Sequence, residues 1–522
     1  MANLNRQAIS RMERDWSGLP ESPKPPTPHH RLLTDLNIVG TGSLCQLFST
    51  LATPLAWRRF FSNVLNSDGA TVRIDRQGAV AALMPALDHR QRLYLATAEI
   101  RSDGRVEDQL LHWATAKEHA PKIPPRWSVV GLTVASVVTL AAVAVAGVPV
   151  TVLGGVLIVN LIVNLIYLPQ IHQALEALER SGTTLRRYER MIDIVLTGAV
   201  DEPYLSQLLS PFYGTTPATT EIRRLQRLVN FADLRRSGMV YLLLQPFTMW
   251  SFHVFSGLLK WQQRVGHKIF VWMEALTEYE LLATLAGLHY DNPGWCFPTI
   301  KVGHTDIQAI GLGHPLIADG VRVNNDITLG RTQPLLFITG SNMSGKSTLL
   351  RALGINILLA QMGGAVCAQR LVMPPVTLAT CFNVQDALVA GRSFFMAELL
   401  CIRTAIDTLE SARYVEGQQL VFLFDEILRG TNSLDRRIAV EMIIRRLLAA
   451  DAIGIIATHD LELANKQPLR RRSQLMHFED QIQIVKGKVL LQFDYRLREG
   501  IATTSNALML LKAVGIDTTK ER

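Results

Sequence analysis

The most restrictive feature of the sequence is a long apolar run without a charged side chain, from Trp127 to Leu168. Gly147, Val148 and Pro149 interrupt the run near its middle, and this predicts one helix on each side of a turn. Each half holds about 20 residues, which as a helix measures about 30 Å, the thickness of the hydrocarbon core of a bilayer. The run therefore predicts a transmembrane helical hairpin over 127–168.

Basic side chains flank this hairpin, and its turn is uncharged. Lys122 and Arg126 precede it, and the basic residues that follow it are Arg180, Arg186, Arg187 and Arg190. Because basic residues collect on the cytoplasmic side of a membrane, both ends of the hairpin are expected in the cytoplasm. A hairpin buried in the core of a large soluble protein is the alternative.

Two amides within the hairpin, Asn160 and Asn164, lie one helical turn apart on the same face. They are expected to donate hydrogen bonds to the other helix or to a second copy of the chain. A transport pathway is disfavoured, because two helices without an ionisable residue offer poor passage to a polar solute. A third apolar stretch, from Val240 to Leu259, contains Gln245, Pro246 and His253, and we expect a buried or interfacial helix there.

The net charge and the cysteine content set broad limits on the partners of the chain and on its redox compartment. The net charge of +8 and the pI near 9.3 favour an anionic partner without choosing among nucleotide, nucleic acid and acidic lipid. The five cysteines, which are Cys45, Cys296, Cys367, Cys381 and Cys401, form no CxxC pair. Neither a zinc site nor a disulfide framework is indicated, and a reducing compartment fits best.

A glycine-rich loop carries the chemistry of the C-terminal part. The apolar run 335–340 predicts a strand, the segment 349–361 predicts a helix, and Gly340, Gly345, Lys346 and Ser347 between them fill the pattern GxxxxGK[ST]. Such glycines let backbone N–H groups curl around phosphate oxygens, while the lysine reaches the β and γ phosphates and the serine reaches Mg²⁺. The expected nucleotide-binding loop is Gly340, Ser341, Asn342, Met343, Ser344, Gly345, Lys346, Ser347 and Thr348.

Two acids end a second apolar strand, 420–427, about eighty residues further on. Asp425 is expected to hold Mg²⁺ and Glu426 to polarise the attacking water, because burying two carboxylates at a strand end is costly without such a role. A third β-rich run delivers His459, which would sense or stabilise the γ-phosphate. The predicted catalytic residues are therefore Lys346, Glu426 and His459.

Four motifs in order resemble those of the MutS family. GSNMSGKST is similar to its phosphate loop, with Asn342 and Met343 matching the characteristic pair. DALVAGRSFFMAE resembles its signature segment, DEILRGTNSLD its Walker B and D-loop, and ATHD its histidine switch. The segments GHPLI and VRVNNDITL, the tail 494–516, and more faintly 32–54 and 272–298, also resemble parts of this family.

The resemblance implies further roles. Ser393 and Asp435 of one protomer would approach the nucleotide held by the other, so that two chains would enclose ATP in a homodimer. Arg322 and Val323 would flank the adenine, although Arg322 replaces a usual aromatic residue and a solvated surface arginine is an equal alternative. Cys367 and Arg436 depart from the family pattern, where proline and glycine are usual.

The combined expectation is an α plus α/β protein. Its predicted parts are a polar Pro-rich segment (1–30), helical core-like regions (31–126 and 169–298) interrupted by the transmembrane hairpin (127–168), and an ABC-type P-loop ATPase domain (299–522). The sequence predicts an ATPase using ATP and Mg²⁺, anchored in the membrane with a cytoplasmic catalytic domain. It would act either as a dimeric clamp on DNA, as in mismatch repair, or as a mechanochemical switch on lipid or protein partners. A transporter is the third and least favoured possibility.

Overall fold

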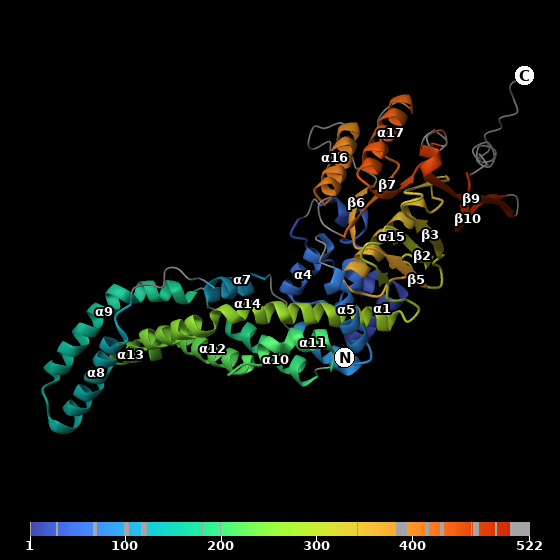
Figure 1. The fold of residues 1–522 in the computed structure, drawn as a ribbon. Coiled ribbons are helices and arrows are strands. Elements are labelled where there is room, and N and C mark those ends of the chain that lie inside the picture. The colour runs from blue at the N-terminus through green and yellow to red at the C-terminus, as the bar shows by residue number, and fades with distance from the viewer. Residues whose placement is uncertain are drawn as a thin grey trace, which may run out of the picture. The chain divides into compact units, whose positions relative to one another are not determined.

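The computed structural model resolves the chain into two compact units (Figure 1). Unit 1 contains Met1–Ser49, Phe60–Pro85 and Leu282–Arg522, and unit 2 contains Thr50–Arg59 and Ala86–Leu281. The structure describes residues 2–27, 30–65, 70–98, 104–115, 123–176, 178, 181–198, 200–341, 343–382, 394–412, 417–428, 433–460, 462, 469–485 and 488–501. The chain passes between the units four times, twice within a helix, namely α4 (Pro54–Leu65) and α14 (Trp250–Asp291).

Unit 1 is built around a six-stranded sheet in the order β10-β9-β4-β8-β7-β6. Its strands are β4 (Leu335–Thr339), β6 (Val376–Cys381), β7 (Gln419–Asp425), β8 (Ile453–Ala457), β9 (Ser473–Val485) and β10 (Lys488–Glu499). All neighbouring pairs are parallel except β9 and β10, which form an antiparallel hairpin. A four-stranded sheet accompanies it in the order β1-β5-β2-β3, with β1 (Thr299–Ile300), β2 (Ile307–Leu312), β3 (Asn325–Leu329) and β5 (Arg370–Met373).

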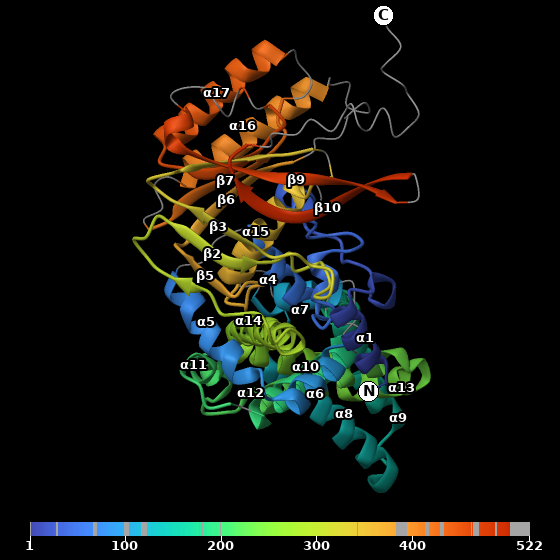
Figure 2. The same cartoon turned by 90° about the vertical axis from the view of Figure 1, so that its right-hand side faces the viewer.

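Helices cover both faces of the larger sheet, as Figure 2 shows from the side. Alternate residues of β7, including Phe422 and Phe424, pack with α16 (Phe394–Ala412) and α17 (Ser433–Ala449) in one core. Leu423 points the other way and lies close to Gly354 of α15 (Lys346–Gln361). Because parallel strands are buried on both faces, β4, β7 and β8 are continuous apolar runs rather than alternating ones. The predicted combination of helices and sheets is confirmed, and both sheets contain parallel as well as antiparallel pairs.

Short N-terminal helices complete unit 1. They are α1 (Ala2–Glu13), η1 (Trp16–Gly18), α2 (Arg31–Asp35), α3 (Leu44–Leu47) and α5 (Ala70–Leu83). Residues 21–25 have no regular secondary structure, as their proline content predicts, whereas α1 before them had no clear sequence signal. Arg11 of α1 forms a buried ion pair of 2.9 Å with Asp291, which fixes this helix to the last turn of α14.

The described residues of unit 2 form helices only. The helices besides α4 and α14 are α6 (Leu87–Ala98), α7 (Arg105–Thr115), α8 (Arg126–Ala146), α9 (Val150–Glu176), α10 (Ser181–Thr197), α11 (Pro203–Leu209), η2 (Ser210–Phe212), α12 (Ala218–Asp233), η3 (Leu234–Arg236) and α13 (Gly238–Thr248). The pair α8 and α9 forms the predicted hairpin, with Gly147 closing α8 in the left-handed region at φ 69°. Both helices are long and apolar enough to cross a membrane.

The expectation of one helix over Val240–Leu259 is wrong. The chain bends by 82° between α13 and α14 at Met249, whose φ of 51° lies in the left-handed region. Pro246 lies in the last turn of α13 and lacks the N–H that a helical residue donates to the turn before it. Counted as one broken span, α13 and α14 would be a third apolar element.

Candidate functional site

The site lies at the carboxyl edge of the larger sheet of unit 1. In the order β4-β8-β7, the three strands end at Thr339, Ala457 and Asp425. Because these strands are parallel and adjacent, the segments that follow them meet at the same edge. The glycine-rich loop, the histidine and the acid pair singled out from the sequence are thereby brought together.

Lys346, the first residue of α15, is buried within the glycine-rich loop. Its Nζ donates hydrogen bonds to the carbonyl oxygens of Gly340 and Ser341 at 2.8 and 2.6 Å, and lies 3.5 Å from Glu426 Oε1. Gly340 and Gly345 have φ of 142° and 107°, values that favour glycine. The loop therefore wraps around its own lysine and directs that cation toward the acid at the end of β7.

Glu426 occupies the centre of the site. Its carboxylate lies between Lys346 and His459, whose Nδ1 is 3.5 Å from Glu426 Oε2. The backbone N–H of Glu426 donates to the carbonyl of Ala457 at 2.9 Å, which ties the acid to the end of β8. At φ 47° the residue adopts the left-handed region, in which glutamate is rarely found. The main chain turns sharply here and holds the carboxylate in place.

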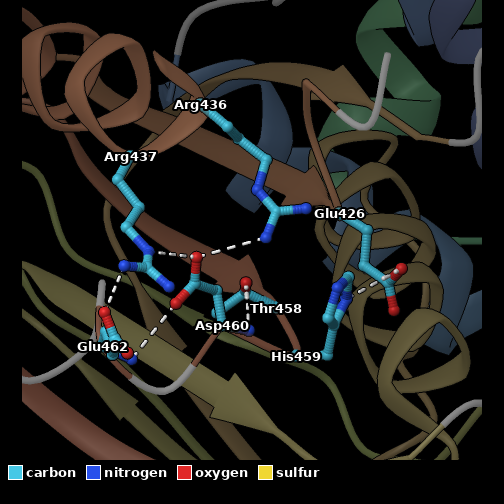
Figure 3. Close-up of polar contacts among 7 residues, drawn as sticks. All are labelled: Glu426, Arg436, Arg437, Thr458, His459, Asp460 and Glu462. Carbon is cyan, nitrogen blue, oxygen red and sulfur yellow. Dashed lines mark hydrogen bonds and ion pairs between the residues drawn. The ribbon is translucent and has the colours of Figure 1, made fainter. Parts of the chain in front are cut away.

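A second polar cluster supports the histidine segment (Figure 3). Asp460 Oδ2 accepts hydrogen bonds from Arg436 Nη2 at 3.1 Å and Arg437 Nε at 2.9 Å, and Arg437 also binds Glu462. Arg436, one of the two departures from the family pattern, is thus used to anchor the residue beside His459. This network restrains the loop after β8.

A divalent cation fits one pair of side chains. Ser347 Oγ donates to Asp425 Oδ2 at 2.5 Å, and oxygen ligands of this kind suit Mg²⁺. No group of three or more His, Cys, Asp or Glu able to hold a metal occurs among the described residues. Mg²⁺ bound through phosphates typically has only one or two protein ligands, so the pair matches a nucleotide-borne ion rather than a resident metal.

A buried hydroxyl and two glycines that lie close to neighbouring side chains mark space for an anion beside the loop. Ser344 Oγ is buried and has no hydrogen-bond partner among the described residues. A Cβ at Gly340 would lie 2.9 Å from that oxygen, and one at Gly345 would lie 3.1 Å from the ring of Tyr495. These features fit a cradle that accepts phosphate oxygens at the start of α15.

A cavity of about 480 Å³ opens beside the loop. It is lined by Leu312, His314, Ile317, Val321, Arg322, Val323, Asn325, Met343, Gly345, Thr348, Leu349, Ala352, Phe478 and Tyr495. Burial, with smaller contributions from two nearby arginines, lowers the pKa of His314 to about 4, so this imidazole is neutral at pH 7. The size and the largely apolar lining suit a planar heterocycle.

Arg322 belongs to the wall of this cavity. Its side chain is 8% exposed and is held by Asn324 Oδ1, Ile317 O and Asp319. A solvated surface arginine is therefore not what the structure contains. Val323 lies beside it and also lines the cavity.

Several residues singled out from the sequence lie outside the described residues. They are Asn342, the signature segment from Asp386 to Ser393, and Gly430 to Asn432 of the D-loop, whereas the rest of the signature segment begins α16. Asp435 is described at the exposed start of α17. The second departure, Cys367, is buried, and its backbone N–H donates to Asn356 Oδ1 at 2.6 Å, a bond that proline would lack.

Sequence reasoning gave no binding role to several residues of the cavity, among them His314, Phe478 and Tyr495. His314 was noted only within a motif, and Phe478 and Tyr495 come from the β9–β10 hairpin, far along the chain from the loop. The carbonyl of Tyr495 accepts a bond from Asn325 Nδ2 at 3.0 Å, and Leu497 N donates to Asn325 Oδ1 at 2.7 Å. These two bonds hold the hairpin against β3, and neither can be inferred from residue spacing.

Unit 1 thus contains a layered α/β domain in which a lysine-bearing glycine-rich loop, an acid pair and a histidine converge at one sheet edge. In agreement, residues 336–519 match the family model of MutS domain V. The chain is 31% identical over 248 residues to the DNA mismatch repair protein MutS of Natronomonas pharaonis, covering 46% of this chain and 27% of that protein.

Two other relatives agree. Identity is 30% over 272 residues to the DNA mismatch repair protein MSH6 of Arabidopsis thaliana, covering 49% of this chain and 19% of that protein. It is 30% over 250 residues to MutS of Thermotoga petrophila, covering 47% and 29%. The chain therefore spans less than a third of the length of these relatives. The similarities support the MutS family for the region around domain V.

Proposed function

We propose that the chain is an ATPase that hydrolyses ATP to ADP and phosphate in unit 1. The observation that carries this proposal is the convergence of Lys346, Ser347, Asp425, Glu426 and His459 at the ends of three adjacent parallel strands. Charged groups buried this closely are costly unless they serve chemistry. Phosphoryl transfer to water needs a cation at the phosphates, a metal ligand pair and a base, and these side chains supply each.

Each side chain has a proposed role. The loop Gly340, Ser341, Asn342, Met343, Ser344, Gly345, Lys346, Ser347 and Thr348 binds the phosphates, with Lys346 neutralising the β and γ groups. Ser347 and Asp425 would hold Mg²⁺, which when bound neutralises charge on the phosphate oxygens. Glu426 accepts the proton of the attacking water, and His459 contacts the γ-phosphate from the neighbouring strand.

The adenine is proposed to occupy the cavity beside the loop. Arg322 and Val323 lie on one side, and a guanidinium plane can stack on a heterocycle as an aromatic ring does. Phe478 and Tyr495 contribute aromatic surface on the hairpin side. The base-binding residues therefore come from the segment before β3 and from the end of the sheet.

We infer a homodimer with composite nucleotide sites. Ser393 and Asp435 would reach the nucleotide of the partner protomer, as the resemblance of their segments to the MutS signature and D-loop implies. The exposed position of Asp435 at the start of α17 is compatible with a contact to a second chain. ATP binding would draw two catalytic units together and hydrolysis would release them.

Membrane anchoring through α8 and α9 is the second part of the proposal. Large apolar side chains along both helices face outward, including Val134, Val138, Ile158, Leu161 and Leu165. A hairpin in a soluble core would bury these side chains, so the alternative of a core hairpin fits poorly. The catalytic unit would then face the cytoplasm, where ATP is present.

The partner on which the ATPase acts has two candidates. The names of the relatives, DNA mismatch repair proteins, favour a nucleotide-driven clamp on DNA. The apolar hairpin favours a mechanochemical switch that acts on lipid or on a membrane protein. Both use the same ATPase, and they differ in whether DNA changes its turnover.

ATP hydrolysis by the full chain in nanodiscs tests both parts. Wild type is expected to hydrolyse ATP, Lys346→Ala is expected to lose nucleotide binding and turnover, and Lys301→Ala, which changes an exposed lysine of the same unit, should retain them. Hydrolysis that survives in Lys346→Ala would overturn the site. Stimulation by duplex or branched DNA at moderate salt would favour the clamp, because nonspecific phosphate contacts weaken with salt. Turnover indifferent to every DNA would favour the switch.

A further inference from the structure

We propose that α13, Met249 and the first turns of α14 form a re-entrant element, which enters one leaflet of the bilayer beside the hairpin and turns back without crossing. The proposal rests on the membrane anchoring inferred above. It assigns the hydrocarbon chains of lipid as the partner of the exposed face of α13. From the sequence alone, this segment is expected only to be a buried or interfacial helix.

The broken backbone of this element is satisfied by polar side chains of the hairpin. Asn160 Nδ2 donates to Ser136 Oγ of α8 and to the carbonyl of Pro246, both at 2.7 Å. Thr133 Oγ1 donates to the carbonyl of Thr248 at 3.1 Å. Non-helical backbone is tolerated at membrane depth only where its carbonyl and N–H groups have protein partners, and here the hairpin provides them.

Side-chain amides complete the same network. Gln245 Nε2 donates to Asn164 Oδ1 at 2.7 Å, while Gln245 Oε1 accepts from the backbone N–H of Ser251 at 2.9 Å. Asn164 Nδ2 lies 3.6 Å from the sulfur of Met249. Asn160 therefore binds both the other helix of the hairpin and the break, while Asn164 binds the break, which extends the packing role predicted for them.

The outer face of α13 is apolar and uncovered. Met239, Leu242 and Leu243 are 82%, 74% and 64% exposed. No Asp, Glu, Lys or Arg occurs between Arg236 and Lys260. A helix in water would expose charged side chains on such a face, whereas a lipid-facing helix exposes apolar ones. The helix α13 packs beside α8 and α9 (Figure 1), which also expose apolar side chains.

The dimensions are too small for the element to cross the bilayer. The 11 residues of α13 and the segment from Trp250 to Lys260 each measure about 16 Å. Two such arms joined by a bend of 82° form a V whose ends lie about 25 Å apart, less than the thickness of the ~30 Å hydrocarbon core. The V therefore cannot cross the bilayer between Arg235 and Lys260.

The N-terminal end of the V lies near the C-terminal end of α9, where the chain leaves the hairpin. Arg235 Nη1 donates to the carbonyl of His172 in the last turns of α9 at 3.5 Å, and Tyr241 OH lies 3.0 Å from His172 Nε2. His172 follows Asn160 by about three turns of helix, roughly 18 Å. The element thus descends along α9 from its charged end toward its middle.

Cysteine labelling in sealed proteoliposomes tests this geometry. Met239→Cys and Leu243→Cys are compared with Met442→Cys, a 67% exposed methionine of α17 in unit 1, and with Val138→Cys on the outer face of α8. A membrane-impermeant maleimide should react at least about tenfold slower at positions 239 and 243 than at 442, because the reactive thiolate forms only in water. Quenchers on lipid chains should quench a bimane label at 138, 239 and 243.

The outcomes separate this inference from the anchoring on which it rests. If position 138 is quenched by lipid but 239 and 243 react like 442, the re-entrant element is wrong and the hairpin anchor stands. If position 138 also reacts like 442, the anchor fails and the re-entrant element fails with it. Ser237→Cys and Lys260→Cys should react from the same side, and reaction from opposite sides would show a full crossing instead.

Discussion

The carboxyl edge of the catalytic sheet and the middle of the apolar hairpin both bury polar groups, but of opposite kinds. At the sheet edge the buried groups are ionic, with Lys346, Asp425 and Glu426 all less than 10% exposed. In the hairpin, Ser136 and Asn160 are neutral, and Asn160 donates to Ser136 Oγ and to the carbonyl of Pro246 at the helix break. The difference teaches that a charged cluster serves chemistry, whereas matched neutral amides fasten helices together.

Neutralising a charge at the sheet edge should remove activity and keep the fold. Glu426→Gln is expected to lower ATP turnover about 10²–10⁴-fold, because the amide cannot accept a proton from water. Binding of ATP should persist, as measured by a fluorescent nucleotide. Glu410→Gln, on the exposed side of α16, is the matched control. Wild-type turnover in Glu426→Gln would exclude the assigned base.

Adding a charge in the hairpin should have the reverse effect. Asn160→Asp places a carboxylate near the middle of an apolar helix, at a cost of about 2.5–3.5 kcal/mol, and removes the donor to Pro246 O. The melting temperature in detergent at pH 8 should fall sharply. Lowering the pH should restore part of the loss by neutralising the acid. An unchanged melting temperature would mean that this region is hydrated.

A buried carboxyl away from the catalytic edge sharpens the contrast. Asp35 accepts hydrogen bonds from Thr380 Oγ1 and the N–H of Phe382, yet burial raises its pKa from 3.8 to about 6. The folded state therefore binds a proton more tightly, so Asp35 lowers stability as pH rises from about 4 to 6, by up to about 3 kcal/mol above pH 6.

Asp35→Asn should remove this pH dependence. The variant is expected to melt higher than wild type at pH 7.5, with the gap closing toward pH 4, because below the unfolded pKa both states are protonated. Buried His314 titrates over an overlapping pH range, but it is present in both wild type and Asp35→Asn. Its effect therefore cancels when the melting temperatures of the two proteins are subtracted. Asp451→Asn, an exposed aspartate of the same unit, should show no such trend. A gap that widens toward low pH would contradict the assigned shift.

Glycine positions give the smallest expected effect. A Cβ at Gly266 of α14 would lie 2.3 Å from the carbonyl oxygen of Ala114, so Gly266→Ala should destabilise by about 1–3 kcal/mol despite alanine's higher helix propensity. At Gly155 of α9 nothing lies within 4 Å. Gly155→Ala should be neutral or stabilising in the same thermal-melt assay. Equal behaviour of the two variants would refute close packing at Ala114.

Local patterns in the sequence were sufficient to predict the secondary structure around the glycine-rich loop and the helical hairpin. The strand, glycine-rich loop and helix around Lys346 follow from composition and spacing, and the hairpin turn follows from Gly147 and Pro149. The residues involved are close in sequence, so propensity and periodicity determine their structure. The roles assigned to the catalytic side chains, and the domain boundaries, stay predictions.

Features that depend on distant contacts could not be predicted. Met249 is left-handed without being glycine, because the side chains of Asn160 and Gln245 bind the surrounding backbone. The aromatic wall of the cavity comes from Phe478 and Tyr495, whose positions depend on the register of β9 and β10. No spacing rule connects these residues to the groups they contact.

The left-handed turn at Glu426 has a consequence for how the sequence can vary. A non-glycine residue with φ near 47° carries a conformational cost of about 1–3 kcal/mol. Glycine or asparagine would adopt this turn more easily, so selection for stability alone would replace the glutamate. The position is therefore a point of conflict between stability and activity, where a more stable protein would be an inactive one.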